Sequence, residues 1–263
     1  MSPLWRERLY IGLSPERVVL ARAGRGLHAR LGARQSIDCS EGGWEGALSE
    51  ALRKPEWQNT LATVILSNRM VRYQVVPWRE HLDATEVAAL MRHSFNAVYG
   101  PAADGWELRW HSDKHATPWL ASGVEQALLA RVRAILAEAK IKLYSLQPYL
   151  MTAFNRWLGE FKHGQQWFVL GESGHACICL LQDGAWASVG NHRVEQDWQE
   201  TVKMIIEREI VLAGSHEMAQ EVLLRAPESC GLIEGVRRLQ APLLAGLSVE
   251  EAGQYAMALE GVA

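Results

Sequence analysis

Apolar residues fall in short runs along the first quarter of the chain. Two such runs, residues 9–13 and 17–23, flank a proline-containing turn and predict a hairpin of two strands. Residues 27–34 alternate apolar and polar side chains, and this period of two predicts a third strand with one buried face. Residues 44–52 carry apolar side chains every fourth position, as in an amphipathic helix, and residues 61–66 form a continuous apolar strand. The predicted order is strand, strand, strand, helix, strand.

A different pattern follows, and it predicts a compact α+β subdomain inserted into the first half. Residues 71–76 form a strand that ends at Pro77, and Asp83 with Glu86 provides a helix N-cap signal. The helix that starts there buries apolar residues as far as Gly100. The remaining predicted segments are a strand at 106–111, a strand at 119–122 and a helix from about Gly123 to 139.

The rest of the chain predicts a second sheet with its own helices. A strand at 141–146 and a helix from Gln147 to Trp157 precede a linker at 159–164, where glycine and polar residues are enriched. Beyond the linker we expect strands at 166–171, 175–182, 185–190 and 221–225, and helices at 198–213, 230–239 and 250–259.

Both halves therefore open with an apolar strand, a turn of small residues and a returning strand. This layout resembles the half-domain of the actin-like ATPases, in which an acidic residue beside the glycine of the first strand organises the metal ion and phosphates. Tyr10 and Val169 occupy the positions where that acid is expected, beside Gly12 and Gly171. The architecture is expected to be kept and its chemistry lost.

The resemblance implies an α/β (α+β) chain with an actin-like fold of two ribonuclease-H-like domains. The first domain is predicted to span residues 1–158, with the small inserted subdomain at about 69–142. The second is predicted to span residues 159–263.

Composition narrows the function classes. The chain has 263 residues, 48% of them hydrophobic, and a net charge of −3, so it lacks the basic face of a sequence-independent nucleic-acid binder. Eleven tryptophans are expected to serve mainly in packing. Four scattered cysteines do not form a disulfide framework, and neither a signal peptide nor a membrane span is recognisable. We expect a soluble, cytoplasmic protein.

Four local sequence matches, in order along the chain, carry a more specific resemblance. They are Ile11-Gly12, Val76-Pro77, Leu146-Gln147-Pro148 and Tyr255-Ala256-Met257-Ala258-Leu259. With these matches the chain resembles the PilM/GspL/MshI group of actin-like proteins from type IV pilus and type II secretion machines. The resemblance implies a cytoplasmic protein held at the inner membrane by a partner.

The departures from that group concern nucleotide chemistry. Neither hairpin has the Asp-Ile-Gly sequence, and Ala226-Pro227-Glu228-Ser229 replaces a nucleotide-binding Gly-Gly. The stretch between Ala213 and Glu221 is too short for the extra subdomain of full-length members, and we expect the chain to lack the membrane helix that GspL and MshI carry. The chain resembles a trimmed, PilM-like member with degenerate nucleotide motifs.

Without an aspartate to hold Mg²⁺, phosphoryl transfer loses its central element. We therefore expect no enzyme activity, no catalytic residue and no metal or cofactor. Backbone amides can still cradle an anion weakly, so binding of ATP with Mg²⁺ is kept as an alternative. The residues that would contact such a nucleotide are Gly12, Ser14, Gly171, Glu172, Ser173 and Gly174. The competing hypothesis is an ATPase or small-molecule kinase with relocated metal ligands, for which Glu16, Glu172 and Asp183 are the candidates.

Two other groups of side chains contain potential metal ligands, but we do not expect either group to bind a metal ion. His175, Cys177 and Cys179 would share one face of a strand, but such a row spans about 13 Å, too far for one zinc ion. Buried strand cysteines are common, so we expect these to be core residues. His111 and His115 flank a turn and are expected to lie in a surface loop.

In PilM-like proteins a short cytoplasmic tail of an inner-membrane partner docks between the inserted subdomain and the first core. The resemblance therefore implies that Arg69, Arg72, Val76, Pro77 and Trp78 bind a partner. The alternative is that Trp78 packs a junction and the arginines are solvated. The leading hypothesis is a non-catalytic scaffold that binds such a tail, and in addition a motor ATPase or itself. An interaction platform unconnected with secretion is the third hypothesis.

Overall fold

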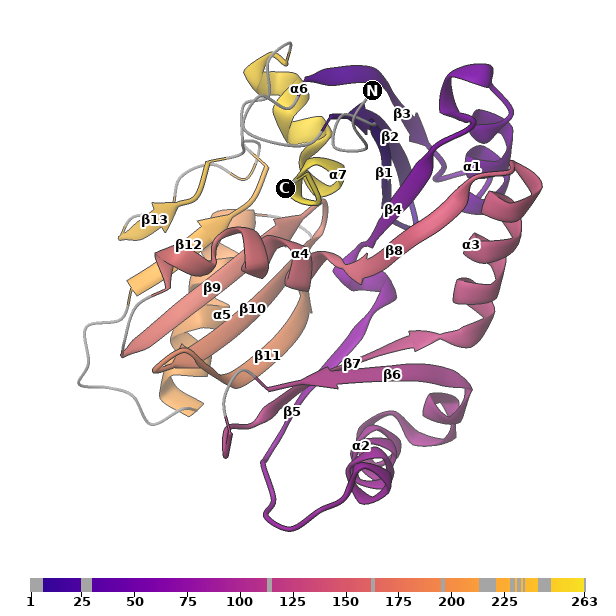
Figure 1. The fold of residues 1–263 in the computed structure, drawn as a ribbon. Coiled ribbons are helices and arrows are strands. Elements are labelled where there is room, and N and C mark those ends of the chain that lie inside the picture. Colours follow the sequence, from indigo (N-terminus) through magenta and orange to yellow (C-terminus); the bar gives the residue numbers. More distant parts are fainter. Residues whose placement is uncertain are drawn as a thin grey trace. The chain divides into compact units, whose positions relative to one another are not determined.

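The structure is a computed structural model, and it describes residues 7–24, 30–112, 115–161, 164–194, 197–212, 221–227, 230, 233, 235–240 and 247–262. The chain divides into two compact units. The first unit comprises residues 1–70, 128–158 and 240–263, and the second comprises 71–127 and 159–239. Each unit contains a five-stranded sheet (Figure 1), and a smaller three-stranded sheet belongs to the second unit.

The sheet of the first unit has the strand order β3-β2-β1-β4-β8. Strands β1, β2 and β3 are antiparallel neighbours, whereas β4 runs parallel to both β1 and β8. The bounds are β1 Arg8–Leu13, β2 Arg17–Ala23, β3 Leu31–Asp38, β4 Leu61–Leu66 and β8 Lys142–Pro148. A hairpin-rich start and a crossover helix that returns to an inner strand confirm the predicted ribonuclease-H-like order.

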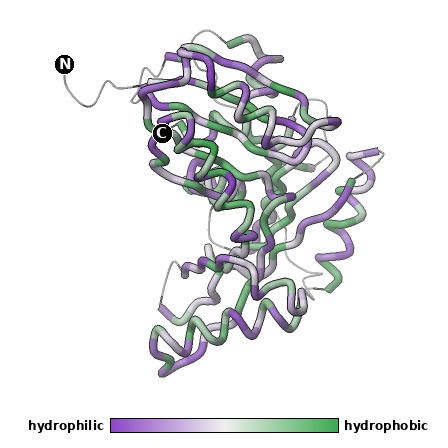
Figure 2. The backbone as a smooth tube through the Cα atoms, turned by 90° about the vertical axis from the view of Figure 1, so that its right-hand side faces the viewer, coloured by the Kyte–Doolittle hydropathy of each residue, from purple (hydrophilic) through white to green (hydrophobic). Residues whose placement is uncertain are grey.

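Helices pack on the sheet of the first unit. Helix α1 packs against β2, and α7 packs against β1, β2 and β4. The helices of this unit are α1 Trp44–Leu52, α3 Gln126–Glu138, α4 Tyr149–Arg156, α6 Val249–Gln254 and α7 Ala256–Glu260, with short 3-10 turns η2 Pro55–Trp57 and η3 Asn68–Met70. Along the helices the hydrophobic and hydrophilic colours alternate with each turn (Figure 2), because one face meets a sheet and the other meets water.

The second unit repeats the same sheet order, as β11-β10-β9-β12-β13. Helix α5 (Trp198–Leu212) covers one face of this sheet (Figure 1), where Val202 and Ile206 pack among side chains of β9, β10 and β12. The bounds are β9 Gln165–Glu172, β10 His175–Gln182, β11 Ala185–Arg193, β12 Glu221–Arg225 and β13 Val236–Arg238, and η5 spans Leu158–Glu160. The repeat of the module is therefore present in the tertiary structure as well as in the sequence pattern.

The inserted subdomain is a three-stranded sheet, β5-β7-β6, with α2 packed on one face (Figure 1). Asp83 and Glu86 form the predicted capping box at the start of α2. The bounds are β5 Arg72–Val76, α2 Ala84–Tyr99, η4 Gly100–Gly105, β6 Trp106–His111 and β7 Trp119–Glu125. This subdomain groups with the second sheet, since β5 lies beside β11 and Asn191 Nδ2 donates to the carbonyl oxygen of Val71 at 3.2 Å. The compact units thus group this subdomain with the second sheet, and the predicted domain bounds stay a prediction.

Some predicted elements differ in the structure. The helix expected at 230–239 is wrong for residues 236–238, which form β13 and pair in parallel with β12, while residues 231, 232 and 234 lie outside the described residues. The helix expected from Gly123 begins at Gln126, because Gly123 belongs to β7. A Cβ atom at Gly123 would lie 2.8 Å from the Phe95 ring, so the glycine is needed for packing in the sheet. The described part of the third strand spans 31–38, and residues 25–29 lie outside the described residues.

Candidate functional site

The turn between β1 and β2 is closed by its own hydrogen bonds. The amide of Ser14 donates to the carbonyl oxygen of Arg17 at 3.0 Å, and the amide of Arg17 donates to Ser14 Oγ at 3.0 Å. The Ser14 hydroxyl donates back to the Arg17 carbonyl at 3.1 Å. Since its amide and hydroxyl are both engaged inside the turn, Ser14 is poorly placed to cradle a phosphate.

Gly12 and Tyr10 lie on the face of β1 that is covered by the C-terminal helix α7. A Cβ atom at Gly12 would lie 3.0 Å from Met257 Cε and 3.3 Å from the amide nitrogen of Ala258. Tyr10 is only 2% exposed. This face of the strand is therefore filled by packed protein atoms, where an ionised carboxylate would be costly.

The hairpin of β9 and β10 is packed in a comparable way on its α5 face. A Cβ atom at Gly171 would lie 2.6 Å from Ala226 Cβ and 2.8 Å from the Trp198 ring. Glu172 pairs with His175 across the turn formed by Ser173 and Gly174. Gly174 has a φ of +68°, a conformation that favours glycine, so its role in the turn is conformational.

The strand registers show that the two glycines are not equivalent positions. In the first hairpin Ser14 and Arg17 flank the turn, and in the second Glu172 and His175 do so. Counting the same number of residues back from each turn makes Ser14 equivalent to Glu172 and Gly12 equivalent to Leu170. The sequence patterns align Gly12 with Gly171, which is one residue beyond Leu170, its equivalent by register. Neither register places an aspartate on β1 or β9.

Of the three alternative metal ligands, Glu16 belongs to the first unit, and Glu172 and Asp183 belong to the second. Glu172 is the last residue of β9, beside the β9–β10 turn. Glu16 forms an ion pair with Arg69, with 2.8 Å between Oε1 and Nη2. Asp183 accepts a hydrogen bond from the amide of Gly164 at 2.9 Å, at the opposite end of β10 from the Glu172 turn. Across the described residues, no cluster of three or more His, Cys, Asp or Glu side chains has the geometry to hold a metal ion.

Cys177 and Cys179 are core residues, as predicted. Their sulfur atoms lie 3.9 Å apart, and both side chains are buried in β10. The hydrogen bond with Cys179, together with burial, raises the pKa of the Cys177 thiol well above its ordinary value. His175 is partly exposed at the end of the strand and, among the described residues, is not part of a three-ligand group.

The predicted partner-binding residues are divided between the two units. Arg69 belongs to the first unit, where it pairs with Glu16, and the other four belong to the second. Arg72 is exposed at the start of β5, about 13 Å along the strand from the buried Val76. Pro77 is exposed, and Trp78 is half-buried with its ring centroid 5.2 Å from that of His115.

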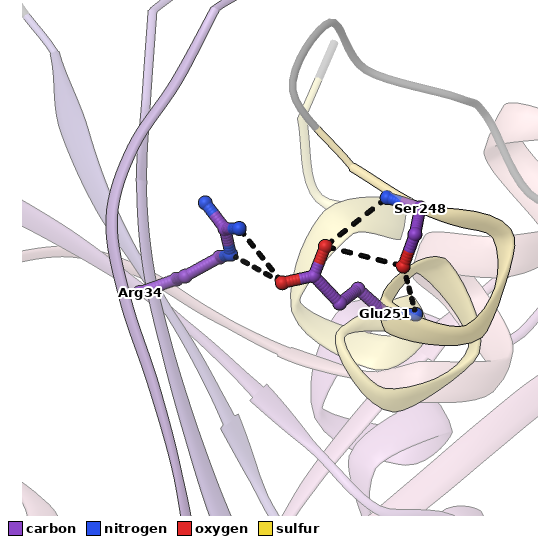
Figure 3. A network of polar contacts seen from close by, with 3 residues as sticks. All are labelled: Arg34, Ser248 and Glu251. Carbon is purple, nitrogen blue, oxygen red and sulfur yellow. Dashed lines mark hydrogen bonds and ion pairs between the residues drawn. The ribbon is translucent and has the colours of Figure 1, made fainter.

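A polar network that was not predicted from the sequence ties the C-terminal region to β3 (Figure 3). Glu251 accepts hydrogen bonds from the amide of Ser248 at 3.1 Å and from Arg34 Nη2 at 2.7 Å. The bond from Ser248, followed by those of Arg34, lowers the pKa of Glu251. The Ser-x-x-Glu spacing of a capping box could have revealed half of this network.

Comparison with known proteins identifies the fold. No model of a known protein family and no curated relative matches the chain. Among solved structures, a chain of the PilM–PilN type IV pilus biogenesis complex superposes with a TM-score of 0.69 and 13% identity, over 98% of each chain. The chain has the actin-like ATPase fold.

Two further structures share this actin-like fold. The cytoplasmic domain of EpsL, an inner-membrane component of the type II secretion system of Vibrio cholerae, matches with a TM-score of 0.63 and 12% identity, over 97% of this chain and 95% of that one. A Bacteroides thetaiotaomicron protein with an actin-like ATPase fold matches with a TM-score of 0.62 and 9% identity, over 97% of this chain and 98% of that one. In the described part of the chain, no helix is long and apolar enough to cross a membrane.

Proposed function

We propose that this actin-like protein is a non-catalytic scaffold of a type IV pilus or type II secretion-like assembly. The observation that carries the proposal is the packing of its two hairpins. At the positions nearest each turn, β1 and β9 carry apolar side chains and glycines that lie close against atoms of α7, α5 and Ala226, with Glu172 as the one carboxylate.

This packing leaves the two hairpins without the groups that phosphoryl transfer requires. Catalysis of that class depends on a carboxylate that positions Mg²⁺ and on donors that stabilise charge on the transferred group. Tyr10 is buried under α7, and the Ser14 amide is engaged within its own turn. A fold kept without these groups is suited to binding other proteins rather than to turning over nucleotide.

The proposed partner is the short cytoplasmic tail of an inner-membrane protein, which would hold the scaffold at the cytoplasmic face of the membrane. One similar structure is a PilM–PilN complex, and another is the cytoplasmic domain of an inner-membrane component. The exposed Pro77 and half-buried Trp78 at the end of β5 are the side chains of this chain best placed for such contacts. Tryptophans are frequent energetic centres of interfaces.

The first test is calorimetric titration of the purified protein with ATP and Mg²⁺ up to millimolar nucleotide. We expect no binding heat, and the same flat trace when EDTA replaces Mg²⁺. Saturable, magnesium-dependent heat would contradict a scaffold without nucleotide chemistry.

The partner is tested with synthetic peptides of the cytoplasmic tails of candidate inner-membrane pilus and secretion proteins. We expect Arg72→Ala combined with Trp78→Ala to abolish peptide binding, with circular dichroism unchanged. Arg109→Ala is a matched control, because Arg109 is 80% exposed on the other edge of the same small sheet. Unchanged binding by the double variant would reject this docking surface.

One observation favours a second candidate, a nucleotide-binding ATPase or kinase. Glu172 lies beside the β9–β10 turn and is partly exposed, so it is the carboxylate most able to serve as a relocated metal ligand. If the titration shows magnesium-dependent binding, Glu172→Gln should abolish it. Retention of binding in Glu172→Gln would exclude this residue as the ligand.

A further inference from the structure

Strand β6 is an outer edge of the small sheet β5-β7-β6, and no described strand pairs with its outer side. The carbonyl oxygen of Arg109 accepts a hydrogen bond from Ser122 Oγ of β7 at 3.4 Å, so the backbone of this residue points inward. The amide of Trp106 donates into the preceding turn η4 and not to β7. Because backbone direction alternates along an antiparallel strand, the amides and carbonyls of Leu108 and Trp110 point outward. An open edge of this kind is a template for pairing with another extended chain.

The sequence of this edge is symmetrical about Leu108. Tryptophans stand two residues to either side, at Trp106 and Trp110, and residues of opposite charge stand one residue to either side, at Glu107 and Arg109. When two copies of the strand pair antiparallel with Leu108 at the centre, Trp106 of each copy lies opposite Trp110 of the other. In the same register Glu107 of each copy lies opposite Arg109 of the other. The edge is therefore complementary to itself.

The apolar side chains of β6 lie on the face that α2 covers. Trp106 and Leu108 belong to the core cluster there, and the Trp106 ring meets Phe95 edge to face with 6.3 Å between the ring centroids. Trp110 packs against the same cluster but is only half-buried, so part of its ring is exposed at the edge. Aromatic pairs across neighbouring strands stabilise antiparallel pairing. A second copy of β6 would therefore extend this apolar layer beyond the edge.

The charged side chains of β6 lie on the opposite face. Glu107 and Arg109 form an ion pair along the strand, with 2.6 Å between Oε1 and Nη2, and Arg109 is 80% exposed. His111 shares this face, and the residues of β7 that lie beside these three are uncharged: Leu120, Ser122 and Val124. On the other face the guanidinium of Arg92 is engaged by the backbone, where its Nη2 donates to the Trp106 carbonyl oxygen at 3.0 Å. Because the charges of Glu107 and Arg109 balance within one copy, their order along the strand and not their sum selects the partner.

That order favours one pairing over its alternatives. A parallel second copy in register would place Glu107 beside Glu107 and Arg109 beside Arg109. An antiparallel copy shifted by two residues, the smallest shift that still pairs the outward backbone groups, places Glu107 opposite Glu107 or Arg109 opposite Arg109. Like charges directly opposite each other are destabilising, whereas opposite charges stabilise the pair. The antiparallel register centred on Leu108 gives opposite charges at both positions.

We propose that β6 pairs antiparallel with β6 of a second copy of this chain, about a two-fold axis at Leu108, and joins the two small sheets into one of six strands. Backbone hydrogen bonds between the two Leu108 residues, and from the Trp110 amide to the Trp106 carbonyl of the other copy, fix the register. Such an interface is isologous and closes at the dimer.

The dimer is expected to be weak. The contact involves residues 106–110 of each copy, which is fewer than the roughly 20–30 residues a side of a standard interface, so we expect a Kd between about 1 μM and 1 mM. Strand β6 is the edge of the small sheet opposite β5, where the tail-binding residues Arg72 and Trp78 lie. Either proposal can therefore fail without the other.

The test is sedimentation equilibrium of the whole protein at concentrations up to about 1 mM, where we expect wild type to show a monomer–dimer equilibrium. Glu107→Arg and Arg109→Glu each place like charges opposite one another at both positions, so each should raise the Kd of the dimer by about tenfold or more. Both side chains lie on the face away from α2, so both variants are expected to fold, with circular dichroism as the check. Wild type that stays monomeric at every concentration would overturn the proposal.

Charge exchange identifies the register. The double variant Glu107→Arg/Arg109→Glu exchanges the two charges and restores opposite pairs, so it should dimerise as wild type does. An equimolar mixture of the two single variants should likewise form a mixed dimer at concentrations where each alone is monomeric. Arg72→Ala with Trp78→Ala is the control and should leave the equilibrium unchanged. Single variants that dimerise as wild type, or a double variant as weak as the single ones, would place the interface elsewhere and reject the proposal.

Discussion

Replacement of Gly171 by alanine tests whether this glycine serves packing rather than phosphate binding. The new methyl group would lie 2.6 Å from Ala226 Cβ and 2.8 Å from the Trp198 ring, both closer than real Cβ atoms approach. Overpacking of this kind costs about 1–3 kcal/mol. Alanine also restricts the unfolded chain, which offsets about 0.4–1 kcal/mol. We therefore expect the free energy of unfolding to fall by about 1–2 kcal/mol.

The assay is urea unfolding followed by tryptophan fluorescence. The slope of the free energy of unfolding against urea concentration is compared with that of wild type, because a different slope would indicate a changed unfolding transition. Gly46→Ala is the matched control, because its Cβ atom meets open space and lies within a helix. This control should gain about 0.5–1 kcal/mol, so the same chemical change has opposite signs at the two sites.

A compensating change tests the same contact from its other side. Ala226→Gly removes the atom nearest to the new methyl group, so the double variant Gly171→Ala/Ala226→Gly should recover part of the loss. Contacting residues typically couple by about 0.5–3 kcal/mol in such cycles. A Gly171→Ala protein as stable as wild type, or additive effects in the double variant, would refute the packing argument.

Three other outcomes are expected. Glu260→Ala should lower the free energy of unfolding by about 3 kcal/mol in urea melts, because it breaks the buried ion pair between Glu260 and Arg156. This value is at the low end of the range for broken buried ion pairs, because Arg156 is 24% exposed and keeps its hydrogen bond to the Val262 carbonyl oxygen. The melting-temperature advantage of wild type over Glu251→Gln should be present at pH 7 and disappear as pH falls below 4.5, because on folding the hydrogen bond from the Ser248 amide, followed by those of Arg34, lowers the pKa of Glu251. The four cysteines are buried, so a thiol reagent should label none in the native protein and all in urea; rapid native labelling would contradict their burial.

The sequence predicted most of the individual elements. The β1–β2 and β9–β10 hairpins, the inner strands β4 and β12, and the capped helix α2 all form close to their expected bounds. Each depends on periodicity and turn chemistry within a few residues, and such patterns are visible locally. The repeat of the module followed from comparing the two patterns, and the resemblance of that module to the actin-like half-domain implied the fold.

The candidate site was less predictable. The absence of an aspartate on β1 and β9 was apparent from residue identities. The engagement of Ser14 within its turn and the offset between Gly12 and Gly171 required backbone registers.

What the sequence alone determined was the order and type of most secondary elements, since local burial patterns specify them. Tertiary structure decided which distant segments meet. Residues 236–238 are a strand because the edge of β12 pairs with them, and Gly12 is covered by Ala258 from the other end of the chain. Such contacts depend on how separate elements bury their apolar faces against each other, and no local pattern records the identity of the partner face.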